Sequence, residues 1–228
     1  MLKIEAVFFD LDGTLLDRSA SVVKFIEDQY DRFWPALSLI DKQQYKSRFI
    51  ELDSRGYVWK DKVYSQLLKE FSITDLKWED LLEDYMTNFK HSCIGFPHLH
   101  EVLGNLRQMG VKVGLVSNGK TSFQMDNVKA LGIEEYFDSI LISEAVGYRK
   151  PDPRIFQLAL DELGVWATNS IFVGDHPEND VAAARNVGMV GVWKRDDYWE
   201  EAEADFIIED LKSLVSIILE GAAFNERL

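Results

Sequence analysis

The stretch Ile4–Leu16 reads IEAVFFDLDGTLL and changes from apolar to acidic at Asp10. Its first half predicts a short strand that is buried on both faces, because the run is almost continuously apolar. Asp10 and Asp12 then stand two positions apart where the chain leaves the strand, and Gly13 permits a turn conformation that other residues avoid. Two carboxylates that face one small volume favour a hard divalent cation held by oxygen ligands, so a magnesium site is the first hypothesis. The alternative is an ordinary turn rich in Asp and Gly.

The composition of the chain excludes several classes of partner. Its 228 residues are 46% hydrophobic, which is enough for a substantial core in one large domain or two small ones. A net charge of −14 argues against nucleic acid and disfavours an anionic membrane surface. The single Cys93 cannot form an internal disulfide, and no segment predicts a signal peptide or a membrane span. We therefore expect a cytoplasmic protein, and the sequence does not indicate its oligomeric state.

The strand at the start is followed by about eighty residues with helical periodicity. Apolar residues recur at helical spacing between Val22 and Phe33, between Val63 and Phe71, and between Leu81 and Phe89. The pattern stops at Gly95-Phe96-Pro97, where Gly and Pro interrupt a helix. Residues 17–94 are therefore predicted to form an inserted all-helical domain, and residues 1–16 with 95–228 to form the core.

From Leu99 onward, predicted helices and strands alternate. The predicted strands cover about 111–116, 139–142, 170–173, 189–193 and 206–208, and the helices between them begin near 121, 153 and 179, with a last helix that stops at Gly221. Asp152 before Pro153 predicts a capped helix start. Strand, crossover helix and parallel strand in repetition predict an α/β fold with a doubly wound, mainly parallel, Rossmann-like sheet.

Chemically reactive residues follow four of these strands. They are Asp10 and Asp12 after the first strand, Ser117, Asn118 and Gly119 after the next, Lys150 beyond the third, and Asp175 with Asp180 after the fourth. Because ligands of such sheets bind beyond the carboxyl ends of the strands, these residues are expected to converge on one site.

The residue types at this site suit phosphoryl transfer. Asp10 can attack phosphorus and form an aspartyl phosphate, Lys150 supplies a compact positive charge, and Asp12 can act as general acid and then as general base. The substrate phosphate is expected on Ser117, Asn118, Gly119 and Lys150, and Mg²⁺ on Asp10, Asp175 and the carbonyl of Asp12, with Asp180 and Thr14 supporting the site from behind.

The motifs DLDGT (Asp10–Thr14), VSN (Val116–Asn118), KPDP (Lys150–Pro153) and GDHPEND (Gly174–Asp180) resemble, in order and spacing, the four-motif signature of the haloacid dehalogenase superfamily. The resemblance implies that the helical insert is the family's C1 cap, and it implies the site roles given above. It also implies a phosphatase or phosphomutase, because dehalogenases of the family lack an acid at the position of Asp12.

The sequence thus predicts a Mg²⁺-dependent hydrolase that removes phosphate from a small phosphorylated metabolite. One alternative is a phosphomutase similar to β-phosphoglucomutase, and another is a binding or regulatory module without turnover. The pattern selects neither the substrate nor the cap residues that set specificity. His176, inside the fourth motif, is expected to shape its loop rather than to bind the metal, because a hard cation prefers oxygen ligands.

Overall fold

The computed structural model describes residues 4–224, and within them the chain divides into two compact units. One unit runs to Asp17 and resumes at Gly95, and the other is the inserted Arg18–Ile94. Among residues 4–224, no helix combines the length and the apolar character that crossing a bilayer requires. The two units are described in turn.

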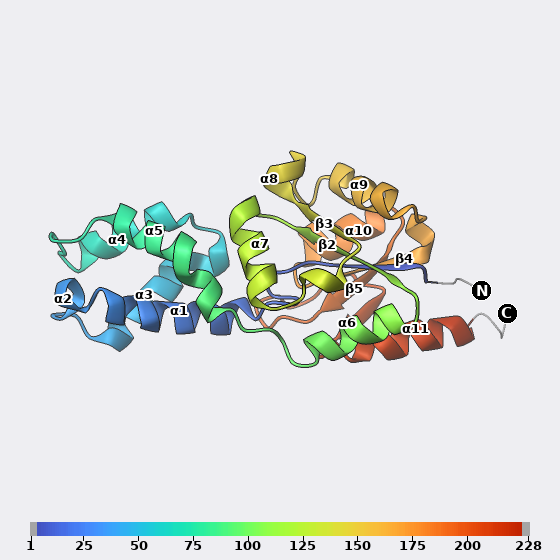
Figure 1. The fold of residues 1–228 in the computed structure, drawn as a ribbon, viewed down its shortest axis with the longest axis horizontal. Helices are drawn as coiled ribbons and strands as arrows, with labels where there is room; N and C mark the ends of the chain where they lie inside the picture. Colours follow the sequence, from blue (N-terminus) through green and yellow to red (C-terminus); the bar gives the residue numbers. More distant parts are fainter. Residues whose placement is uncertain (1–3, 225–228) are drawn as a thin grey trace. The chain divides into compact units, whose positions relative to one another are not determined.

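The first unit is built on a six-stranded sheet in which every neighbouring pair is parallel (Figure 1). The strand order is β3-β2-β1-β4-β5-β6. The strands are β1 (Ala6–Phe9), β2 (Lys112–Ser117), β3 (Ser139–Ile142), β4 (Ser170–Gly174), β5 (Val190–Lys194) and β6 (Phe206–Ile208). The predicted α/β fold with a parallel sheet and a helical insert is confirmed.

Strand β1 lies at the centre of the sheet, between β2 and β4. All four of its residues are fully buried, as its apolar sequence predicts for a central parallel strand. Phe9 pairs in register with Leu115 of β2 and with Val173 of β4, so the three strands end at nearly the same level. The strand order reverses at β1, and ligands of open α/β sheets bind at such a switch point.

Helices cover both faces of this sheet. Helix α9 (Pro153–Leu163) packs on β2 and β3 beside α10 (Ala183–Asn186), while α6 (Leu99–Gln108) packs on β2 and against α11 (Ser213–Phe224) (Figure 1). Helix α7 (Thr121–Ala130) connects β2 to β3, and the short α8 (Ser143–Val146) follows β3. At the start of α9, Asp152 caps the backbone N–H of Arg154, as predicted.

Two predicted helix boundaries were wrong. The last helix continues through Gly221 to Phe224, because one glycine inside a helix costs only about 1 kcal/mol and does not by itself end it. The helix predicted to begin near Asn179 begins at Pro177, and its first part, Pro177–Ala182, is π-helical. The remaining short helical turns are 3₁₀ segments at Ser54–Gly56, Phe89–Ser92, Glu134–Tyr136 and Ala167–Asn169.

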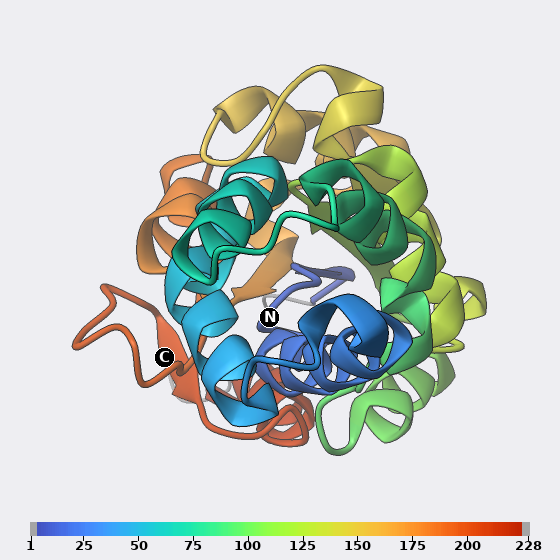
Figure 2. The same ribbon diagram turned by 90° about the vertical axis from the view of Figure 1, so that its left-hand side faces the viewer.

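The second unit is entirely helical among its described residues. It consists of α1 (Arg18–Arg32), α2 (Trp34–Leu37), α3 (Lys42–Asp53), α4 (Lys60–Glu70) and α5 (Trp78–Asn88). The longer helices pack in the sequence α5, α1, α3, α4 and back to α5, around a shared interior that Figure 2 shows from one end. Phe25, Phe49 and Phe89 are buried there, so their helical spacing reflects a packed core.

Candidate active site

The chain makes a tight turn directly after β1. The amide of Gly13 donates to the carbonyl of Leu16 at 2.9 Å, and the amides of Leu15 and Leu16 donate to that of Leu11 at 3.0 and 2.9 Å. Gly13 has φ +85°, and a Cβ at this position would overlap the carboxylate of Asp175. Glycine is therefore required twice, for the left-handed backbone and for the close approach of the carboxylate.

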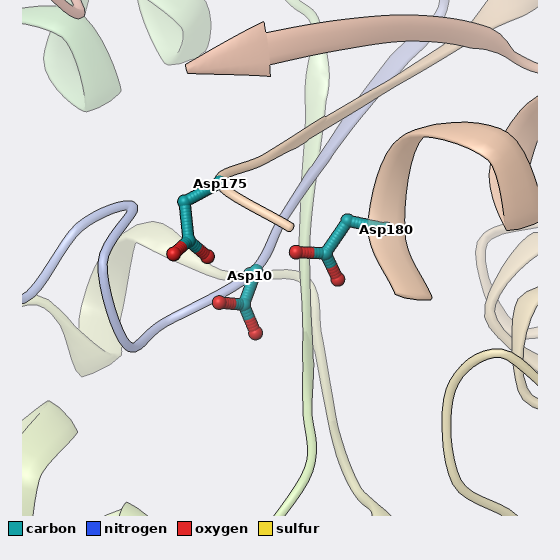
Figure 3. A group of neighbouring side chains, drawn as sticks. All are labelled: Asp10, Asp175 and Asp180. Atoms are coloured by element: carbon teal, nitrogen blue, oxygen red, sulfur yellow. The ribbon is translucent and has the colours of Figure 1, made fainter. Parts of the chain in front are cut away.

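Three carboxylates meet at the carboxyl end of the sheet. Asp10 follows β1, Asp175 follows β4, and Asp180 reaches back from the π-helical segment; one oxygen of each lies within 4.8 Å of the others (Figure 3). A Cβ on Gly174 would overlap the side chain of Asp180, so the end of β4 also approaches a carboxylate closely. No other group of three potential metal ligands this compact is found in the described part of the chain.

Lys150 is the cation that contacts this cluster. Its Nζ lies 2.5 Å from Oδ1 of Asp10 and 2.6 Å from Oδ1 of Asp180, and its side chain is only 3% exposed. Asp10 and Asp180 are 7% and 2% exposed, so both ion pairs are shielded from water. Lys150 thus pairs with two of the three carboxylates, and the charge of Lys194 interacts with that of the third, Asp175.

Burial and crowding shift the pKa values of these groups. Burial raises the pKa of Asp10 to about 7, with Asp180 and Asp12 adding to the shift and Lys150 opposing it. Burial also raises the pKa of Asp175 well above its usual value, and the charges of Asp10 and Asp180 add to this. For Lys150, burial alone would lower the pKa, but the two adjacent carboxylates outweigh it and raise the pKa above its ordinary value.

The cluster meets the chemical requirements of a hard metal ion. It offers only oxygen donors, it is mostly shielded from solvent, and its carboxylates resist ionisation in the protein without a cation. A divalent ion would offset the cost of burying these charges and the repulsion between them, which together raise the pKa values. The acidic triad Asp10, Asp175 and Asp180 is therefore able to bind a metal, whereas the sequence placed Asp180 behind the site rather than among the candidate ligands.

The loop after β2 lies beside Lys150. The side-chain amide of Asn118 donates to the backbone carbonyl of Lys150 at 2.9 Å and accepts from its backbone amide at 2.9 Å, which anchors the lysine. Ser117 is 1% exposed. The amide of Gly119 donates to the hydroxyl of Ser143 at 3.0 Å, so a contact from Gly119 to phosphate would require that bond to be exchanged. Phosphate binding by this loop remains a prediction.

Asp180 belongs to the cluster, and two other residues named from the sequence, His176 and Thr14, lie on the segments that carry its carboxylates. Asp180 accepts a hydrogen bond from the backbone amide of His176 at 3.1 Å, in addition to its pairing with Lys150. The Nδ1 of His176 accepts from the amides of Glu178 and Asn179 at 3.1 and 3.2 Å, so this ring caps the segment that carries Asp180. Thr14 is fully buried, and its hydroxyl has no hydrogen-bond partner among residues 4–224.

The sequence reasoning missed two residues at the end of β5. The indole Nε1 of Trp193 donates to the carbonyl of Asp175 at 2.8 Å, and Nζ of Lys194 donates to the carbonyl of Gly13 at 3.2 Å. The Lys194 ammonium also lies over the ring of Phe96, 3.3 Å from its centroid, and burial lowers its pKa. The rule that found the other residues, inspection of what ends each strand, would have found Lys194.

Gln124 was also missed, because it lies on α7 and not at the end of a strand. It is 2% exposed, and its Nε2 lies 2.6 Å from Oδ2 of Asp12. A polar residue at a buried position of the helix that follows the VSN motif was the available signal. Asp12 itself is partly buried and lies on the turn after β1.

Comparison with known proteins identifies the family. The model of the haloacid dehalogenase-like hydrolase family matches residues 7–193, and the chain belongs to this family. The glyceraldehyde 3-phosphate phosphatase of Pyrococcus abyssi is 30% identical over 196 residues, which are 83% of this chain and 81% of that protein. The glyceraldehyde 3-phosphate phosphatase of Methanocaldococcus jannaschii is 32% identical over 127 residues, which are 54% of this chain and 56% of that protein.

Among solved structures, the HAD-hydrolase YfnB of Bacillus subtilis, crystallised with bound magnesium, superposes with a TM-score of 0.76 at 22% identity, covering 95% of this chain and 99% of that chain. At this identity the similarity shows the fold alone. The predicted membership in the haloacid dehalogenase superfamily is confirmed, and so is its enzyme class, a hydrolase with phosphatases among its relatives.

Proposed function

We propose that this protein is a Mg²⁺-dependent phosphatase that hydrolyses the phosphomonoester of a small metabolite through an aspartyl phosphate on Asp10. The observation that carries the proposal is the pairing of buried Asp10 with Lys150 at 2.5 Å, at the carboxyl end of the central strand and beside two further carboxylates. A structural ion pair needs no further carboxylates crowded beside it, whereas a site for a metal cation does.

In the first step, a carboxylate oxygen of Asp10 attacks phosphorus, the bond from phosphorus to the leaving oxygen breaks, and Asp12 gives its proton to that oxygen. In the second step, Asp12 takes a proton from a water molecule as the water oxygen attacks phosphorus. The bond from phosphorus to Asp10 breaks, and inorganic phosphate and the free carboxylate are formed. Lys150 stays beside Asp10 in both steps and stabilises negative charge on the phosphoryl oxygens.

Mg²⁺ would be held by Asp10 and Asp175, with Asp180 in reach. When bound, the ion supplies positive charge that offsets the carboxylates and the phosphate oxygens. The roles of Ser117, Asn118, Gly119 and the carbonyl of Asp12 are proposed as the sequence motifs imply them.

The substrate class is proposed from the relatives. Enzymes that act on glyceraldehyde 3-phosphate, phosphoserine and phosphoglycolate are among them. These substrates are small phosphomonoesters whose leaving groups are alcohols, which must be protonated as they depart. The presence of Asp12 supports a reaction of this kind.

A screen of phosphorylated metabolites with Mg²⁺, read as inorganic phosphate, tests the proposal. The wild type is expected to release phosphate from at least one metabolite, and a chelator is expected to stop the release. Asp10→Asn should lower kcat at least about 10³-fold, because it removes the nucleophile. Asp161→Asn, the same change at an exposed position of α9, should leave kcat unchanged. Full activity in Asp10→Asn would refute the assignment.

The same screen separates the phosphomutase alternative. A mutase would convert hexose 1-phosphate into its isomer with little free phosphate, whereas the proposed phosphatase releases phosphate and the free sugar. Failure to release phosphate even from a generic aryl phosphate, by a folded sample with Mg²⁺, would favour the module without turnover.

A further inference from the structure

A buried amide side chain lies against the carboxylate of Asp12. Gln124 is one turn inside α7 and is 2% exposed. Its Nε2 lies 2.6 Å from Oδ2 of Asp12, 3.0 Å from Oγ of Ser117 and 3.2 Å from the carbonyl of Asn118. The shortest of the three contacts joins the amide to the carboxylate, and this contact links α7 to the turn after β1.

Contacts at both polar atoms of the Gln124 amide, Oε1 and Nε2, determine its orientation. Asn127, fully buried one turn further along α7, donates from Nδ2 to Oε1 of Gln124 at 3.2 Å. If the amide were reversed, Oε1 would face the Asp12 carboxylate at 2.6 Å and two acceptors would repel each other. Asn127 and Asp12 thus favour the same orientation, in which the N–H group points to the carboxylate.

The surroundings of Gln124 are shaped to this side chain. A Cβ on Gly119 would lie 2.8 Å from Cγ of Gln124 and 2.9 Å from its Nε2, so only glycine leaves room for the amide. Burying an amide costs free energy unless its hydrogen bonds are formed, and an apolar side chain would fill the same space without that cost. Helix α7 nevertheless has two buried amide side chains one turn apart, Gln124 and Asn127, and the first of them donates a hydrogen bond to Asp12.

We propose that Gln124, oriented by Asn127, is the positioning residue of the acid–base group Asp12. The inference rests on the proposed function, because it assigns Asp12 the proton transfers described there. By holding Oδ2, Gln124 fixes the rotamer of the carboxylate and leaves Oδ1 as the oxygen that carries the proton. The proton passes from Oδ1 to the leaving oxygen in the first step, and from water to Oδ1 in the second.

This role makes a prediction that a merely structural role does not make. Loss of the Gln124 contact should slow the two steps that need Asp12 and spare a first step that needs no proton. An alcohol requires protonation as it leaves, whereas 2,4-dinitrophenolate is a stable anion and leaves without a proton. The effect of the substitution should therefore depend on the leaving group.

The test compares Gln124→Met with wild type on glyceraldehyde 3-phosphate and on 2,4-dinitrophenyl phosphate. Methionine keeps the length of the side chain and removes the hydrogen bonds. For glyceraldehyde 3-phosphate, kcat/KM should fall about 100-fold, as expected when a reacting group is misplaced. For 2,4-dinitrophenyl phosphate, the pre-steady-state burst of dinitrophenolate should change less than about threefold. Steady-state turnover should slow, because the second step still needs Asp12 as a base.

Phosphoenzyme should therefore accumulate in Gln124→Met during turnover of the aryl phosphate, and its amount can be measured by mass spectrometry after acid quench.

Asn127→Leu should act in the same direction. Its kcat/KM for glyceraldehyde 3-phosphate should fall less, by about tenfold, because the Gln124 amide remains but is less well oriented. If Gln124→Met does not fold, Asn127→Leu provides the same comparison of the two substrates. Gln157→Met, the same change at an exposed position of α9, is the matched control and should leave both substrates unaffected.

An equal fall for both leaving groups, burst included, would show that Gln124 only supports the fold and would overturn the inference. Unchanged kinetics for both substrates would overturn it as well. Failure of the proposed function is distinguishable, because the wild type itself would then release neither phosphate nor dinitrophenolate.

Discussion

The two units of the molecule bury carboxylates in opposite ways. In the sheet-containing unit, Asp10, Asp175 and Asp180 lie together, and Lys150 pairs with Asp10 and Asp180. In the helical unit, Asp84 accepts two hydrogen bonds from Arg32, at 2.8 and 2.7 Å, and one each from Gln29 and Asn88, both at 2.9 Å. Asp53 in the same unit pairs with both Arg18 and Lys60.

The difference distinguishes structure from chemistry. Asp84 and Asp53 each contact donors that include positively charged side chains, so their burial needs no ligand to explain it. In the sheet unit, burial raises the pKa values of Asp10 and Asp175, and the charges of the neighbouring carboxylates add to the shift. Crowded, buried carboxylates with raised pKa values therefore mark the site where a cation and a substrate are expected.

The largest expected effect is a loss of stability with rising pH in the absence of metal. Below pH 3.8 Asp10 is protonated in both states; between about pH 4 and 7 the unfolded chain releases this proton while the folded protein keeps it. The free energy of unfolding should therefore fall over this range, by up to about 4 kcal/mol, and then level off. Urea unfolding in a chelator between pH 4 and 9 measures this.

Asp10→Asn provides the control for that pH dependence. The variant lacks the titrating group, so its free energy of unfolding should fall less between pH 4 and 7 and should exceed that of the wild type at pH 8. Parallel curves for the two proteins would contradict the view that burial of Asp10 destabilises the protein without metal. Added Mg²⁺ should restore the stability of the wild type at pH 8 and leave that of Asp10→Asn nearly unchanged.

The second effect is that replacing a buried Asp by Asn should change the free energy of unfolding in opposite directions in the two units. Asp84→Asn should lower the free energy of unfolding by about 2–3 kcal/mol, less than for a fully buried pair because the Arg32 side chain is 37% exposed. Asp175→Asn should raise it in metal-free buffer at pH 8, because the substitution removes a charge that the site disfavours. Thermal melting of both variants, with and without Mg²⁺, provides the measurement.

Magnesium adds a second readout to this pair of variants. It should stabilise wild type and Asp84→Asn to the same extent, and it should not stabilise Asp175→Asn. If both variants were destabilised without metal, or if Asp175→Asn still responded to Mg²⁺, the distinction between the two kinds of buried carboxylate would be wrong.

The sequence predicted those features that depend on neighbours along the chain. The strands follow from apolar runs. Asp10 and Asp175 follow from their positions at strand ends, and Lys150 from the loop beyond the third strand, because parallel strands all end at one edge of a sheet. The contact of Gln124 with Asp12 joins residues 112 positions apart and depends on how α7 crosses the sheet, which periodicity does not specify.

Apolar periodicity also gave no signal for hydrogen bonds between polar side chains and the nearby backbone. The helix start at Pro177 is set by two contacts: Nδ1 of His176 accepts from the following amides, and Asp180 accepts from the amide of His176. Apolar spacing contains no record of either contact. The pairing of Asp84 with Arg32 and of Asp53 with Arg18 was likewise not predictable, since these partners lie 52 and 35 positions apart in the sequence.

The smallest expected effect concerns the second buried cation of the sheet unit, Lys194. It donates to the carbonyl of Gly13 and lies over Phe96, so it anchors the turn that carries Asp12. Lys194→Met should lower kcat about tenfold by loosening that turn. It should not weaken the binding of Mg²⁺, because the Asp10 and Asp175 carboxylates remain and a nearby positive charge is removed.

Steady-state kinetics measures kcat, and calorimetric titration with Mg²⁺ measures the affinity for the metal. Lys129→Met, at an exposed position of α7, is the control. A weaker affinity for Mg²⁺ with unchanged kcat at saturating metal would contradict this prediction and would show that Lys194 supports the metal-binding carboxylates instead of the turn.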